Sequence, residues 1–213
     1  PSGLFFIRGV GTTNAAAGEE GANALYVDNV YIGDLTQTMT NFNNIERVEV
    51  LKGPQGTLFG RNATGGLIHI ITRDPSRDSA TLKGQIGFAN YDTINTQLYV
   101  SGPITDTVSA DVAYAGIYQG KGWGRNLLTG HKVKVQDFDG VRSKVVFRPD
   151  DGMKFTLSGD YSENEDNLGL AWKIDPTTLA SGGVSGPEGH DTTSSNPAMS
   201  AIRIWGLSLT GEI

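Results

Sequence analysis

One stretch of the sequence decides the fold: Ile45-Glu-Arg-Val-Glu-Val-Leu-Lys-Gly-Pro-Gln-Gly-Thr-Leu-Phe-Gly-Arg-Asn-Ala-Thr-Gly-Gly-Leu-Ile-His-Ile-Ile-Thr72. It begins with a β-rich run, is broken around Gly53-Pro54, and resumes with aliphatic residues between 67 and 71. This pattern predicts a strand, a tight connection and a second strand. Glycine tolerates backbone angles that a side chain forbids, so we expect sharp turns at five glycines. These are Gly53, Gly56, Gly60, Gly65 and Gly66.

The same stretch resembles the end of the plug domain of TonB-dependent outer-membrane receptors. The resemblance lies in residues 46–54 and 58–68, and two earlier segments, 7–11 and 26–31, fall where that plug carries similar sequence. It extends over about residues 4–75. The family usually has Arg where Lys52 stands and Asn where His69 stands. Lys keeps the charge but lacks the planar fork that a two-pronged pairing with a carboxylate needs.

Composition narrows the class of protein. The 213 residues include no initial Met and no signal peptide, so we expect a piece of a longer protein. No apolar run approaches about 18 residues, which excludes transmembrane helices but not the weaker strand signals of a membrane barrel. A net charge of −6 with 17 basic residues argues against a nucleic-acid partner. The absence of Cys excludes disulfides and thiolate metal sites.

The first third of the chain is predicted to hold short strands joined by polar segments. One strand is expected over Leu4–Ile7, and a second over Leu25–Ile32, interrupted by a turn at Asp28-Asn29. Residues 11–24 are small and polar without periodicity, which indicates an exposed loop. Apolar residues spaced by four and three indicate a short helix within residues 34–44.

From about Thr81 the pattern changes to an alternation of period two, which predicts six strands with one apolar and one polar face. The apolar residues of the six strands are Leu82, Ile86 and Phe88; Ile94, Leu98 and Val100; Val108, Ala110, Val112, Tyr114 and Tyr118; Val141, Val145 and Phe147; Met153, Phe155, Leu157 and Tyr161; and Trp205, Leu207 and Leu209.

The connections between these strands differ in length between the two ends of the predicted sheet. Residues 102–106 and 148–152 are tight turns by composition, whereas residues 120–138 and 163–201 form long connections. Alternate connections of an up-and-down sheet lie at the same end, so one end has only tight turns. This asymmetry is typical of outer-membrane barrels, with short periplasmic turns and long extracellular loops. A soluble β-sandwich is the alternative, but its loops have no reason to sort by end, and very long loops are uncommon in compact domains.

The predicted fold is therefore mixed. Residues 1–75 are assigned to the C-terminal part of a small α+β plug domain, and residues 76–213 to the first about six strands of an antiparallel transmembrane β-barrel. An open sheet in lipid leaves two unpaired edges, at a cost on the order of tens of kcal/mol against a stability of about 5–15 kcal/mol. Further strands must close it, and by resemblance the complete barrel has about 22.

No motif supports catalysis or a resident metal. The segment Gly53–Gly60 invites a phosphate-loop interpretation but lacks the Gly-Lys-Ser/Thr ending. Asn62-Ala-Thr64 matches a glycosylation acceptor, which we attribute to chance. His69, His131 and His190 lie far apart without ligand spacing. We expect no enzyme, no metal site and no cofactor, with iron present only as part of a transported chelate.

The resemblance assigns a role to several charged residues of the plug. In the family, basic plug residues face carboxylates on the inner barrel wall and help to hold the plug. The residues expected at this plug–barrel polar interface are Arg8, Lys52, Glu46, Arg47, Glu49 and Arg61. For Arg8 and Lys52, the alternative explanation is that they lie on a solvated surface of the plug. Glu212, on the polar face of the sixth strand, is a candidate acidic partner.

Three aromatic residues are candidates for ligand contact. Trp123, Trp172 and Tyr118 lie in or beside the long loops. An interfacial aromatic girdle explains them about as well. By resemblance, the plug loop 11–24 would also face outward and touch a ligand.

The resemblance implies a receptor in the outer membrane of a Gram-negative bacterium that takes up a scarce nutrient, most often a ferric siderophore. Its implied partners are the small-molecule nutrient, the lipid bilayer and TonB, whose contact segment would lie before Pro1. TonB pulls on the plug and opens a path to the periplasm, which needs no covalent catalysis. Two other classes remain: a passive porin, which would lack a separate plug, and a secreted soluble β-protein that binds glycans.

Overall fold

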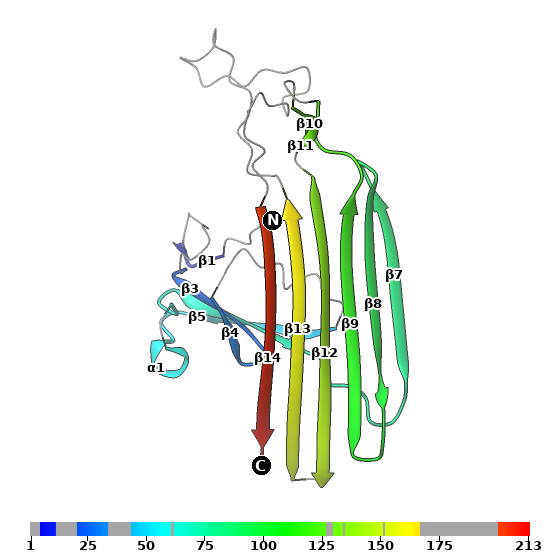
Figure 1. Cartoon of the computed structure of the whole chain (residues 1–213). Helices are drawn as coiled ribbons and strands as arrows, with labels where there is room; N and C mark the ends of the chain where they lie inside the picture. Colours follow the sequence, from blue (N-terminus) through cyan, green and yellow to red (C-terminus); the bar gives the residue numbers. More distant parts are fainter. Residues whose placement is uncertain are drawn as a thin grey trace. The chain divides into compact units, whose positions relative to one another are not determined.

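The computed structural model describes residues 5–11, 21–33, 44–60, 62–126, 130–133, 135–150, 152–166 and 200–213. They belong to two compact units, Pro1–Asp74 and Pro75–Ile213. The first unit holds short strands and one short helix, and the second is built around long strands (Figure 1). None of the helical segments in these ranges has the length and apolar character needed to cross a bilayer.

The first unit contains a mixed four-stranded sheet in the order β4-β3-β6-β5. Strand β3 pairs antiparallel with β4 and parallel with β6, and β5 pairs antiparallel with β6. A separate hairpin joins β1 to β2. The bounds are β1 Phe6–Ile7, β2 Val10–Gly11, β3 Asn23–Val27, β4 Val30–Ile32, β5 Ile45–Lys52 and β6 Gly66–Thr72.

Two predictions for this unit are confirmed. Strands β5 and β6 occupy the two runs on either side of the glycine-rich connection. The interruption at Asp28-Asn29 is a tight turn between β3 and β4, with φ angles of 46° and 67°. Two successive positive φ angles are those of a type I′ turn, which suits the twist of a hairpin.

The helical part of the predicted α+β plug is not confirmed. The helix α1, Gly56–Phe59, has four residues and lies in the connection between β5 and β6, where no helix was predicted. Its last residue packs against the small core formed by Ala24, Ala63 and Leu67. The helix expected within residues 34–44 falls almost wholly outside the described residues.

Three of the five expected glycine turns have positive φ angles. These angles are 92° at Gly53, 72° at Gly60 and 147° at Gly66. A side chain at Gly66 would also collide with the carbonyl oxygen of Leu51 on the neighbouring strand. The expectation is wrong at Gly56, which begins α1 and has open space where a side chain would stand.

The second unit contains the six predicted strands in one antiparallel sheet, in the order β14-β13-β12-β9-β8-β7 (Figure 1). Their bounds are β7 Thr81–Ala89, β8 Thr93–Pro103, β9 Val108–Gln119, β12 Gln136–Asp150, β13 Met153–Asp166 and β14 Ser200–Glu212. The connection predicted as a loop over 120–138 carries a small ladder of β10 Gly124–Arg125 with β11 Lys132–Val133. Of the second long connection, residues 167–199 lie outside the described residues.

The long sheet has one continuous apolar face. Its registers place Val100, Val112, Ser143, Gly159 and Leu207 in a single row across five strands. Leu98, Phe155 and Leu207 are 41%, 37% and 75% exposed, so the alternating residues do not close into a core of their own. An exposed apolar surface of this extent marks a face that contacts a protein or a membrane.

The opposite face of the same sheet carries the polar residues, together with a few buried apolar ones such as Tyr99 and Val146. One row across it consists of Ser101, Asp111, Lys144, Ser158 and Ser208. Asp111 accepts hydrogen bonds from the backbone amide of Lys144 at 2.8 Å and from the hydroxyl of Tyr99 at 3.3 Å. The predicted division into apolar and polar faces is therefore confirmed.

Candidate functional site

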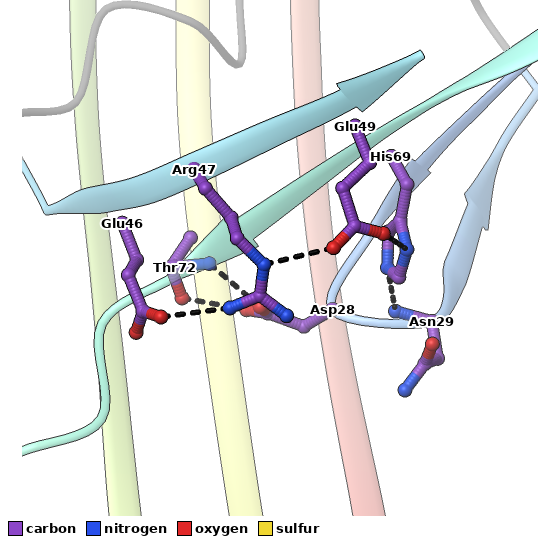
Figure 2. Close-up of polar contacts among 7 residues, drawn as sticks. All are labelled: Asp28, Asn29, Glu46, Arg47, Glu49, His69 and Thr72. Atoms are coloured by element: carbon purple, nitrogen blue, oxygen red, sulfur yellow. Dashed lines mark hydrogen bonds and ion pairs between the residues drawn. The ribbon is translucent and has the colours of Figure 1, made fainter. Parts of the chain in front are cut away.

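Seven polar residues of the first unit form a chain of contacts across β5, β6 and the β3–β4 turn (Figure 2). We call this group the turn network; its members are Asp28, Asn29, Glu46, Arg47, Glu49, His69 and Thr72. It includes three of the charged residues predicted at the plug–barrel interface, and it adds four residues that were not predicted there.

Arg47 lies between two carboxylates on the edge strand β5. Its Nη1 is 2.7 Å from Oε1 of Glu46, and its Nε is 2.8 Å from Oε1 of Glu49. The hydrogen bond to Glu49 contributes most to raising the pKa of Arg47, and Glu46 adds to it. All three side chains are largely exposed, so the ion pairs add little to stability. Their arrangement is a fixed surface pattern with one more negative than positive charge.

His69 connects this charged group to the β3–β4 turn. Its Nε2 accepts a hydrogen bond of 3.2 Å from the backbone amide of Asn29, and its Nδ1 is 3.7 Å from Oε2 of Glu49 (Figure 2). Because Nε2 accepts, the neutral imidazole carries its proton on Nδ1, toward the carboxylate. The imidazole thus links β6 to both the turn and β5.

Asp28 ties the β3–β4 turn to the end of β6. Its Oδ1 accepts a hydrogen bond of 2.9 Å from the Thr72 amide, and its Oδ2 accepts one of 2.7 Å from the Thr72 hydroxyl. Its own amide donates to the Ile70 carbonyl at 3.0 Å. Thr72 is buried, so these bonds are shielded from competing water. The sequence indicated only that Asp28 belongs to a turn; it gave no sign that Asp28 contacts Thr72.

The other predicted interface residues stand apart from the turn network. Lys52 ends β5 with an exposed side chain, and Arg8 is exposed in the β1–β2 turn with a φ of 51°. Arg61 lies outside the described residues. Glu212 is 3.2 Å from Nζ of Lys154 on the adjacent strand, so its acidic group is engaged within the sheet. The contact of these residues with a barrel wall or a plug stays a prediction.

The aromatic ligand candidates separate into different environments. Tyr118 lies on the apolar face, paired with Ile94, and is 59% exposed, which favours the girdle interpretation. Trp123 precedes β10, and its ring centre is 6.3 Å from that of Tyr91 in the β7–β8 turn. Trp172 lies outside the described residues.

A groove of about 540 Å³ lies at the loop end of the apolar face. Asp139 and Glu163 are among its lining residues. Asp139 accepts a hydrogen bond of 2.5 Å from the hydroxyl of Tyr114, and Glu163 accepts one of 3.0 Å from the hydroxyl of Tyr161. Arg203 pairs with Glu163 at 2.6 Å. Within the part of the chain that the structure describes, no three His, Asp or Glu side chains group closely enough to hold a metal ion.

Comparisons with known proteins give a consistent result. The family model described as TonB-dependent Receptor Plug Domain matches residues 2–67. The pesticin receptor of Yersinia pestis is 40% identical over 87 residues, which are 40% of this chain and 12% of that receptor. The ferripyoverdine receptor of Pseudomonas aeruginosa is 28% identical over 137 residues, covering 63% of this chain and 16% of its own length. The chain thus spans less than a fifth of these relatives.

Solved structures extend the similarity into the second unit. The ferric yersiniabactin uptake receptor FyuA from Yersinia pestis aligns with a TM-score of 0.60 and 28% identity, over 69% of this chain and 23% of that receptor. The closed form of the ferric-catecholate import receptor Fiu from E. coli aligns with a TM-score of 0.67 over 88% of this chain and 26% of that receptor. At 21% identity, the latter likeness concerns the fold alone.

Proposed function

We propose, from the premise that this chain carries the plug domain and first barrel strands of a TonB-dependent receptor, that the whole protein takes up a ferric siderophore across the outer membrane. The premise rests on the plug match over residues 2–67 and on the receptors that align with both units. The relatives' names include receptors for ferripyoverdine and pesticin and an iron-regulated outer membrane virulence protein of Vibrio cholerae. Location in the outer membrane of a Gram-negative bacterium follows from the same relatives.

The observation that carries the proposal is the exposed apolar face of the long sheet. It follows directly after the plug sequence, and its opposite face is polar. Lipid on one side and a polar lumen on the other is the environment that such a sheet requires. A secreted soluble protein would bury these residues, and a passive porin would not carry the plug.

The end of the apolar face adds independent support for a membrane. Tyr114, Tyr161 and Trp205 lie in one row of the apolar face, and Trp205 is 75% exposed. The next row toward the loops carries Asp139, Glu163 and Arg203. Aromatic residues between an apolar band and charged residues form the girdle of outer-membrane barrels.

The apolar band also slants across the sheet. On β7 the apolar band extends toward the loop end as far as Phe88. On β14 it ends at Trp205, which is two same-face rows, or four residues, short of the row that contains Phe88. Two rows are about 14 Å along a strand, and five strand spacings of about 4.8 Å separate β7 from β14. The slope corresponds to a strand tilt on the order of 30°, close to the about 35–45° of membrane barrels.

In the proposed mechanism the chemistry is binding and release, without a covalent step. The ligand binds at the extracellular loops and the plug blocks the path, until TonB pulls on the plug from the periplasmic side. The complete barrel of about 22 strands encloses the plug. The charged residues Arg8, Lys52 and the Glu46–Arg47–Glu49 group hold the plug to the wall in the resting state.

Radiolabelled iron uptake in a host lacking its own siderophore receptors tests the proposal. The full-length gene is expected to restore uptake of a ferric siderophore only when TonB is present. Equal uptake in a strain without TonB would show passive passage and would refute active transport. Recovery of the full-length protein in the periplasm, with none in the outer membrane, would refute the membrane location.

A further inference from the structure

The side chain of His69 lies where three elements of the first unit meet. In the sheet registers it stands between Tyr26 of β3 and Glu49 of β5. Only 9% of the residue is exposed, and the Tyr26 ring packs edge-on against it, with 6.4 Å between the ring centres. Its third neighbour is the β3–β4 turn, which it contacts through the Asn29 amide (Figure 2). A change in the charge of the imidazole therefore affects all three elements.

The hydrogen bond between His69 and the β3–β4 turn exists only with a neutral imidazole. Nε2 accepts it from the Asn29 amide at 3.2 Å, using the lone pair that a second proton would occupy. With that proton in place, two N–H donors face each other. Rotating the ring by half a turn about its Cβ–Cγ bond gives no substitute, because the Cε1 carbon then takes the place of Nε2. Protonation therefore removes the partner of the Asn29 amide in either ring orientation.

The charged form of His69 also has a partner within the folded unit. A buried imidazolium without a counter-charge is costly. Nδ1 of His69 is 3.7 Å from Oε2 of Glu49, whereas Arg47 binds the other oxygen of that carboxylate, Oε1, at 2.8 Å. Arg47 also pairs with Glu46, at 2.7 Å. Glu49 is thus placed to pair with the imidazolium while it keeps Arg47. Protonation is accommodated on the β5 side and acts on the turn side, so we expect a local change rather than unfolding.

The other titratable groups beside the imidazole are engaged with partners of their own. On the turn, the Asp28 carboxylate accepts hydrogen bonds from the amide and the hydroxyl of Thr72, at 2.9 and 2.7 Å. On β3, the Tyr26 hydroxyl donates to the Phe59 carbonyl at 2.6 Å. Asp28 therefore keeps its attachment to the end of β6 when the imidazole gains a proton, and the contact that is lost is the one to the Asn29 amide.

We infer that His69 makes the β3–β4 turn pH-sensitive: its neutral imidazole holds the turn at the Asn29 amide, and its protonated form releases it. An imidazole gains its second proton within about pH 5–8. Because the neutral form is the acceptor, the turn is held at the alkaline end of this range and released as the pH falls. Asn29 is exposed, so water replaces the imidazole at its amide once the bond is broken.

Hydrogen exchange at the Asn29 amide of the purified full-length receptor tests the inference. Exchange is compared at about pH 7.5 and about pH 5.5, with the intrinsic chemical rate at each pH divided out. In the parent we expect the protection of this amide to fall about tenfold at the lower pH. The control is the Ile104 amide, which donates to the Val108 carbonyl at 2.8 Å in the β8–β9 turn, where the sequence has no His. Its protection is expected to stay the same.

Two variants separate the acceptor from the charge. His69→Gln places a side-chain amide near the position of Nε2, where its oxygen accepts a hydrogen bond but does not titrate. The protection of Asn29 in this variant is expected not to change with pH. His69→Leu has neither acceptor nor charge, and is expected to show low protection of Asn29 at both pH values. Protection of the β6 amides, which pair with β3 and β5, reports whether each variant is folded.

Three results would overturn the inference. The first is equal protection of Asn29 in the parent at both pH values. The second is an equal loss in the parent and in His69→Gln, which would assign the pH response to the carboxylates of Asp28 or Glu49. The third is full protection of Asn29 in a folded His69→Leu variant, which would mean that the bond to Nε2 does not hold the turn. The inference concerns the first unit alone and goes beyond the proposed function, so each of these results leaves uptake by the receptor intact.

Discussion

At the scale of single residues, Asp28 and His69 hold the β3–β4 turn against the strands behind it. The carboxylate of Asp28 accepts hydrogen bonds from both the amide and the hydroxyl of Thr72, and His69 accepts one from the Asn29 amide. The sequence predicted a turn at Asp28-Asn29 but not these partners. They depend on the parallel pairing of β3 with β6, and local patterns do not encode the register of distant strands. Glu46, Arg47 and Glu49 were predicted at the plug–barrel polar interface; the structure shows in addition that Arg47 pairs with both carboxylates.

Removing the Thr72 hydroxyl tests the Asp28 contact. Thr72→Val keeps the shape of the buried side chain but leaves Oδ2 of Asp28 without this donor. We expect the β6 segment to lose about 1–3 kcal/mol of protection in hydrogen exchange measured on the full-length receptor. Thr64→Val, at an exposed position just before the other end of β6, is the control and should leave protection unchanged. Equal exchange in both variants would mean that the Asp28 contact adds nothing.

Two glycines of the connecting segment should respond oppositely to alanine. Gly66→Ala places a methyl group against the Leu51 carbonyl at a φ of 147°, so we expect a loss of at least about 2 kcal/mol. Gly56→Ala meets open space at the start of α1 and should be neutral or stabilising by up to about 1 kcal/mol. The measurement is the urea midpoint of plug unfolding in the full receptor. A tolerated Gly66→Ala would contradict the close approach of the two strands.

At the scale of elements, the long alternating runs were predictable, whereas the shortest elements within the connections, α1, β10 and β11, were not. Each strand of the long sheet repeats its apolar residue every second position, as in Trp205, Leu207 and Leu209, so the period is clear. The two-residue strands β10 and β11 and the four-residue α1 are too short to show any period. They form because neighbouring backbone groups satisfy one another, which is information outside the local sequence.

A charge placed on either face of β14 tests the assignment of its two sides. Leu207→Arg should destabilise the full-length receptor in lipid vesicles by about 2–4 kcal/mol, because the side chain would enter the hydrocarbon. Ser208→Arg, one residue along on the polar face, should cost less than about 1 kcal/mol. Denaturant titration in vesicles compares them. Similar losses at both positions would mean that neither face meets lipid.

At the scale of the whole molecule, the chain divides at Asp74 into two units with different surfaces. The first unit has its own small core around Leu67, whereas the second leaves the apolar residues on one face of its long sheet exposed. In the proposed receptor, lipid covers one face of this sheet and further strands pair with its edges. The plug resemblance could be identified from sequence because its motifs are local. The contact between the rings of Tyr91 and Trp123 could not be predicted, because it joins two separate connections of the sheet.

The most direct test of a membrane-spanning sheet is spin-label accessibility along β14 in the reconstituted full-length receptor. Single cysteines are placed at positions 205 to 210, in a receptor from which any cysteines beyond these 213 residues have been removed; the 213 residues themselves contain none. We predict high accessibility to oxygen and low accessibility to a water-soluble nickel chelate at 205, 207 and 209, with the reverse at 206, 208 and 210. Nickel accessibility at the odd positions equal to that at the even positions would contradict the account.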